Sequence, residues 1–91
     1  MNEISGRPGL APHVRRHPDR ATGGVLLLHP EGAIELSDTA DAIVRLCDGN
    51  HTVEAIVAEL ADEYDAPVER IREDVAACLG ELAKAGLIRF A

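Results

Sequence analysis

The sequence predicts an α+β domain in which a three-stranded antiparallel meander is followed by a bundle of three helices. Two observations carry this prediction: a hairpin pattern in residues 25–36, VLLLHPEGAIEL, and three capped amphipathic stretches after it. A chain of 91 residues has the length of one small domain. We therefore expect a single domain over residues 12–91, preceded by an arm of residues 1–11 that Gly6, Pro8 and Gly9 should make flexible.

The hairpin consists of two apolar runs, Val25–Leu28 and Ala33–Leu36, on either side of a turn signal. Pro30 pre-sets φ for the first central turn position, and Gly32 is free to take a positive φ. The first run is unbroken, as in a central strand, and the second alternates, as in a strand with one exposed face. A weaker candidate strand, Pro12–His17, should pair with the first run on its other side.

The three helices are predicted from their caps as much as from their apolar stripes. Ser37 and Thr52 are good N-caps, and Pro67 fits the first turn of the third helix. Gly49 and Gly86 follow the ends of the first and third helices. The closing residues LIRF should form a short extended tail, either a wing strand or a lid on the core. A sheet before three short helices is typical of winged-helix-like domains.

The distribution of charge argues against a nucleic-acid partner. The net charge is −7, and residues 31–91 carry five Lys or Arg against fourteen acids. The exposed positions of the third helix hold three cations against four anions: Glu69, Arg70, Arg72, Glu73, Asp74, Glu81 and Lys84. A helix that reads DNA needs a basic surface. A winged-helix DNA-binding regulator remains the alternative function that the fold class suggests, but the distribution of charge disfavours it.

No constellation of residues predicts catalysis, a metal site or a cofactor. His13 and His17 are bracketed by prolines and lack a third ligand, so we expect no metal there. Cys47 and Cys78 lie in apolar helical patterns, as buried free thiols do in a reducing compartment. Residues 1–10 are polar and lack an apolar segment, so we expect no signal peptide, and the sequence contains no run of about 18 apolar residues that would span a membrane. We expect a cytoplasmic protein that is not an enzyme.

The second hairpin strand should leave one edge of the sheet open. Ala33–Leu36 contains no Pro and no Lys, and Glu35 is its only charge, so it lacks the usual devices that protect an edge. The edge is either tolerated because it is short or accepts an extended peptide by strand addition. A second copy could also pair with it, or the N-terminal strands could exchange between protomers at Leu36–Ser37. We therefore expect a monomer or a homodimer.

The run LLLHPEGAIELSDTADAIVRLCDGNHTVEAIVAELADEY, the opening RPGLAPHVRRH and the ending DVAACLGELAKAGLI carry a family resemblance. The chain resembles PqqD, protein D in the synthesis of the coenzyme pyrroloquinoline quinone (PQQ), from about Arg7 to Ile88. The features that carry the resemblance are the hairpin that leads into a capped helix, the LCDG stop, and the amphipathic helix after it.

This resemblance implies a winged-helix-like recognition element for ribosomally synthesised and post-translationally modified peptides (RiPPs). Such a protein is a peptide chaperone that binds the PQQ precursor peptide and presents it to a radical-SAM enzyme. It needs no catalytic residue and no cofactor of its own. The peptide is expected to add to the third strand, at Ala33, Ile34, Glu35 and Leu36. Helical phase places Arg72, Val75, Ala76 and Leu79 of the third helix along the peptide groove.

Overall fold

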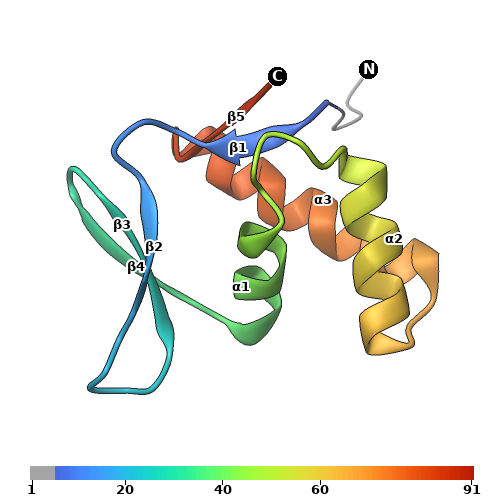
Figure 1. Ribbon diagram of the computed structural model, residues 1–91, viewed down its shortest axis with the longest axis horizontal. Helices are drawn as coiled ribbons and strands as arrows, with labels where there is room; N and C mark the ends of the chain where they lie inside the picture. The colour runs from blue at the N-terminus through green and yellow to red at the C-terminus, as the bar shows by residue number, and fades with distance from the viewer. Residues whose placement is uncertain (1–5) are drawn as a thin grey trace.

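The computed structural model describes residues 6–91 and contains two small sheets and three helices. Figure 1 shows a three-stranded sheet at one end of the molecule and the helices at the other, which confirms the predicted fold class. In chain order the elements are β1 (Pro8–Leu10), β2 (Arg15–Pro18), β3 (Val25–His29), β4 (Gly32–Leu36), α1 (Asp38–Arg45), α2 (Val53–Tyr64), α3 (Val68–Lys84) and β5 (Ile88–Phe90). None of these helices is long and apolar enough to cross a membrane.

The larger sheet is the predicted antiparallel meander, in the order β2-β3-β4. β3 and β4 form the expected hairpin, in which His29 pairs with Gly32 across a two-residue loop. Gly32 takes a φ of +148°, a conformation that its lack of a side chain permits. The first strand starts later than predicted, at Arg15 instead of Pro12, because residues 12–13 make a turn in which His13 has a φ of +67°.

The helix boundaries follow the predicted N-caps, but the first helix ends earlier than predicted, because Arg45 is its last residue and Leu46, not a residue next to Gly49, is its C-cap. The side chains of Ser37 and Thr52 each accept the backbone N–H three residues further on, at 3.1 and 3.0 Å. Pro67 is the N-cap of α3 and lies one position before the predicted first turn. Gly86, just past the end of α3, has a φ of +77° and lets the chain turn back along the bundle.

A second, two-stranded sheet joins the two ends of the described chain, and the sequence did not predict it. β1 pairs antiparallel with β5, with Pro8 opposite Phe90 and Leu10 opposite Ile88 (Figure 1). Pro8 is fully buried, so this part of the predicted flexible arm belongs to the fold. Residues 1–5 of that arm lie outside the described residues. The closing residues form a wing strand, and Ile88 is also buried in the core.

The core lies mainly among the three helices and β5, and it reaches the three-stranded sheet through Leu27 and Leu36. Leu27, in the central strand, is 0% exposed and belongs to the same buried cluster as Ile43. An ion pair also ties the sheet to the bundle. Arg16 of β2 donates from Nε to Asp41 Oδ1 of α1 at 2.5 Å and from Nη2 to Oδ2 at 3.0 Å. This bidentate pair is half-buried, which gives it more weight than a surface ion pair.

Adjacent residues of β3 should differ sharply in their contribution to stability. Leu27→Ala should lower the free energy of unfolding by about 3–5 kcal/mol, because it leaves a cavity in a fully packed core. Leu26 lies on the opposite face of the sheet and is only partly buried, so Leu26→Ala should cost about 1–2 kcal/mol. Urea denaturation followed by circular dichroism measures both losses. Equal losses would contradict the assignment of the inner face.

A cluster of polar side chains closes the turn between α1 and α2. The Asp48 carboxylate accepts the backbone N–H of Asn50 at 2.8 Å and that of His51 at 3.0 Å. The His51 imidazole lies between Asp48, 2.9 Å from Nδ1, and Glu59, 3.1 Å from Nε2. Its hydrogen bond to Asp48 is the main cause that raises the pKa of His51. The backbone N–H donors, His51's first, hold the pKa of Asp48 well below its usual value.

This cluster predicts a pH dependence of stability. A raised pKa in the folded state means that His51 stabilises the fold fully below its unfolded pKa, about 6.5. The contribution is lost as the pH rises through the higher folded value. The gap in urea midpoint between the wild type and His51→Gln should therefore be largest near about pH 6 and shrink towards about pH 9. A gap that grows with pH would contradict the assigned contacts.

Candidate functional site

The outer edge of β4 is the open edge that the sequence predicted, since β4 ends the β2-β3-β4 order and no described strand pairs with its outer side. An unpaired strand offers its backbone donors and acceptors to any extended chain that reaches it. Which groups are offered depends on the phase of the hydrogen-bond ladder.

A single backbone hydrogen bond just beyond the end of β2 shows which residue pairs of the ladder are hydrogen-bonded. The Asp19 N–H donates to the Gly24 carbonyl over 2.9 Å, one step past the opposed pair of Pro18 and Val25. Opposed residues in an antiparallel ladder alternate between hydrogen-bonded and non-hydrogen-bonded pairs. The Pro18 pair is therefore non-hydrogen-bonded, which suits a residue without an N–H.

The same alternation identifies the free groups of β4. Carried along the β2–β3 register, it makes Leu27 a residue whose N–H and C=O point away from β2 and towards β4. Leu27 is opposite Ile34, so this pair carries the hydrogen bonds between β3 and β4. The residues on either side of Ile34, Ala33 and Glu35, direct their N–H and C=O to the open edge.

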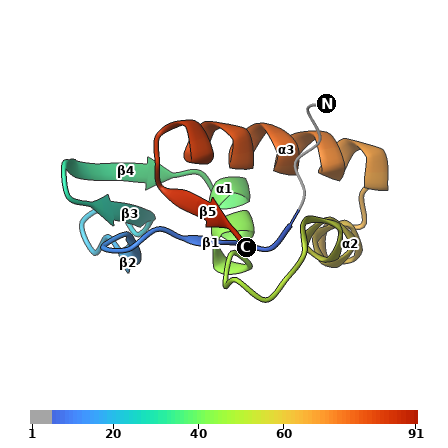
Figure 2. The same ribbon diagram turned by 90° about the horizontal axis from the view of Figure 1, so that it is seen from above.

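Beside this edge lies an open groove of about 560 Å³. It runs between β4, the first turns of α1 and the C-terminal half of α3, and Figure 2 shows β4 pointing to the place where these helices meet. Its lining consists of Ile34, Glu35, Leu36, Ser37, Thr39, Ala40, Ile43, Asp74, Ala77, Cys78, Glu81 and Leu82. Ile34 remains 39% exposed, although it is on the same face as the buried Leu36. The site therefore combines free backbone groups with a partly apolar wall.

The four residues predicted on β4 all lie at the open edge of the sheet. Ile34, Glu35 and Leu36 line the groove, and Ala33 offers backbone groups to the edge without lining the groove.

The α3 half lies elsewhere. Val75 and Leu79 are 1% and 0% exposed and belong to the core. Arg72 points to α2, where its Nη2 donates to Glu54 Oε1 over 2.9 Å and lowers the pKa of that carboxyl. Ala76 does not line the groove either. These four share one helical face, and that face packs against α2 and the core.

The groove wall is instead the next face of α3, at positions 74, 77, 78 and 81. Asp74, Ala77, Cys78 and Glu81 follow an i, i+3, i+4, i+7 spacing, so they lie together along the helix. Sequence reasoning missed them because small and acidic residues resemble an ordinary solvated surface. The sequence feature that could have identified this wall is the pair of small residues, Ala77 and Cys78, between two acidic residues on the helix face next to the apolar stripe.

A small apolar pocket of about 80 Å³ continues the groove between the three helices. It shares Thr39, Ile43 and Asp74 with the groove, and Tyr64, which is 47% exposed, also lines it. The exposed apolar surface therefore extends from β4 to the end of α2.

The two cysteines are free and poorly suited to nucleophilic chemistry. Burial is the main cause that raises the pKa of Cys47 to about 12 and the pKa of Cys78 above its usual value. Both thiols are therefore protonated near neutral pH, and a protonated thiol is a weak nucleophile. Within residues 6–91, no three His, Cys, Asp or Glu side chains gather in a way that would hold a metal ion.

Comparison with known proteins places this chain in a family. The family model described as "Coenzyme PQQ synthesis protein D (PqqD)" matches residues 24–88. The chain belongs to the PqqD family. A "PqqA binding protein" from Rhizobium meliloti (strain 1021) is 45% identical over 74 residues, which span 81% of this chain and 76% of that protein. A relative of the same name from Methylococcus capsulatus is 41% identical over 88% of this chain and 84% of its own.

Solved PqqD structures share the fold. The solution structure of the PqqD part of Methylobacterium extorquens PqqCD, described as a functional, stand-alone RiPP recognition element, matches with a TM-score of 0.79 at 34% identity. The match covers 90% of this chain and 87% of that one. Crystalline PqqD from Xanthomonas campestris matches with a TM-score of 0.63 at 34% identity, over 90% and 91% of the two chains. The resemblance seen in the sequence is therefore confirmed.

Proposed function

We propose that this protein is a peptide chaperone of PQQ synthesis that binds the precursor peptide by strand addition to the outer edge of β4. The observation that carries the proposal is the open edge, at which Ala33 and Glu35 present free backbone groups directly beside a groove. The name of the relatives, PqqA binding protein, supports the PQQ precursor peptide as the ligand.

In this proposal the backbone supplies affinity and the groove supplies selectivity. A peptide paired with Ala33 and Glu35 extends the three-stranded sheet by one strand. Because side chains alternate along a strand, every second residue of the peptide faces the wall formed by α3. The other residues face away and remain available to a further protein.

Presentation to an enzyme follows from this arrangement. An extended, bound segment loses its conformational freedom, while the peptide on either side of the segment stays outside the groove. A radical-SAM enzyme would receive that outer part. The protonated thiols give no support to a catalytic role for this chain, so in the proposal it supplies binding and no catalytic group.

Strand pairing can be tested at Glu35 without changing the internal ladder. Glu35→Pro removes an outward N–H, and an edge strand tolerates proline where its N–H faces solvent. The affinity for the precursor peptide should fall by about fivefold or more, which corresponds to one lost ladder bond. Isothermal titration calorimetry measures the loss, and Glu35→Ala, which keeps the N–H, is the matched control. Equal affinities of the two variants would argue against strand addition.

The groove wall can be tested by filling it. Ala77 is exposed and lines the groove, so Ala77→Trp should block the peptide and reduce its affinity by about tenfold or more. Ala83 is an exposed alanine of the same helix outside the groove, and Ala83→Trp should bind as the wild type does. Unfolding curves confirm that both variants fold. Unimpaired binding by folded Ala77→Trp would mean that the peptide lies elsewhere.

A further inference from the structure

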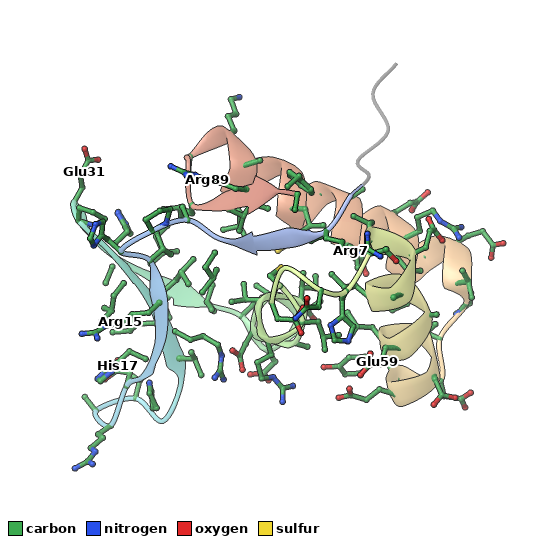
Figure 3. All side chains as sticks on the ribbon, turned by 45° about the horizontal axis from the view of Figure 1, so that its top comes forward. Arg7, Arg15, His17, Glu31, Glu59 and Arg89 are labelled. Carbon is green, nitrogen blue, oxygen red and sulfur yellow. The ribbon has the colours of Figure 1, made fainter. Side chains whose placement is uncertain are left out.

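The charged side chains on the groove wall have one sign. Asp74 and Glu81 line the groove from α3, and no Lys, Arg or His is part of its lining. Within the described part of the chain, neither carboxylate is in an ion pair shorter than 4 Å. The basic residues of β2 do not neutralise them: Arg16 is paired with Asp41 of α1, and Figure 3 shows Arg15 and His17 pointing away from the helices.

The spacing of the two carboxylates is set by the helix. Glu81 lies seven positions after Asp74, which corresponds to about two turns and about 10 Å along α3. Between them lie Ala77 and Cys78, whose small side chains leave room above the wall. Opposite, β4 contributes the apolar Ile34 and Leu36, whereas the Glu35 side chain lies on the other face of the strand, with its Oε2 near Gly24. The groove thus offers an acidic, an apolar and an acidic section in succession.

An extended peptide can match this succession in only one spacing. Residues i, i+2 and i+4 of a strand share a face, and i and i+4 are about 13 Å apart. Long, flexible Lys or Arg side chains at i and i+4 can reach both carboxylates. The residue at i+2 then lies over the small residues between them.

We infer that the groove selects a peptide segment with the pattern cation–x–apolar–x–cation, with its cations at Asp74 and Glu81. The inference rests on the proposed strand addition and names the chemistry of the peptide that this addition selects. The pattern is symmetric, so it holds for a peptide that runs parallel or antiparallel to β4. A net charge of −7 favours the approach of a cationic peptide as well.

The chain also sets the limits of this acidic section. Arg70 lies one helical turn before Asp74, and Lys84 lies just under one turn after Glu81. Both are exposed cations of α3 outside the groove lining. A peptide cation displaced from the two carboxylates would meet a like charge on either side, so the two acids also fix the position of the peptide along the groove.

The test compares labelled nine-residue peptides that differ only at two positions. Their cores are Lys-x-Leu-x-Lys, Gln-x-Leu-x-Gln and Glu-x-Leu-x-Glu, and fluorescence anisotropy measures their binding to the wild type and to the double variant Asp74→Asn, Glu81→Gln.

At low salt the wild type should bind the Lys peptide about fivefold tighter than the Gln peptide, with the Glu peptide weakest. The preference should diminish as NaCl is added. The double variant should bind the Lys and Gln peptides within about twofold of each other. Glu73→Gln removes an exposed acid of α3 outside the groove and should keep the full preference.

Each other outcome overturns a defined part of the proposal. Equal binding of the Lys and Gln peptides by the wild type, or a preference that survives in the double variant, would overturn the assignment of Asp74 and Glu81. If the full-length precursor peptide still bound and were blocked by Ala77→Trp, the proposed function would stand without this selectivity. If neither the precursor peptide nor any of the nine-residue peptides bound, both the selectivity and the proposed function would fall.

Discussion

The register between β3 and β4 is the constraint on which the rest of the structure depends. The loop of Pro30 and Glu31 sets His29 against Gly32, and every later pair of the hairpin follows from this one. The register directs Leu27 into the core and determines which residues of β4 face outward. A slip by one residue would turn the apolar face of the strand to solvent. The stability of the domain and the shape of its open edge therefore have a single local origin.

Helix α3 links the core to the groove because its adjacent faces serve both. One face buries Val75 and Leu79, and the next presents Asp74, Ala77 and Glu81 to the groove. A helix held by a packed face has little freedom to rotate, so the neighbouring face is held in position with it. The backbone of the groove wall is therefore held in place by the same packing that forms the core.

The sequence predicted best what depends on neighbouring residues. The hairpin and the caps at Ser37 and Thr52 are local signals, and all of them are confirmed. The pairing of β1 with β5 joins residues about eighty positions apart, and no local pattern marks it. On α3, the apolar stripe that includes Val75 was assigned to the groove, but strongly apolar positions of a short chain are needed for the core. The residues of α3 that line the groove are small or acidic, and from sequence alone such residues cannot be distinguished from an ordinary solvated surface.

The antiparallel pairing of β1 and β5 has a consequence for how this domain can be joined to others. Pro8, at the start of β1, is opposite Phe90, at the end of β5. The two chain directions out of this small sheet therefore lie at the same corner of the domain (Figure 1). Neither strand contributes to the groove. A tether at either end would hold an attached protein at one common point and leave the groove beside β4 uncovered.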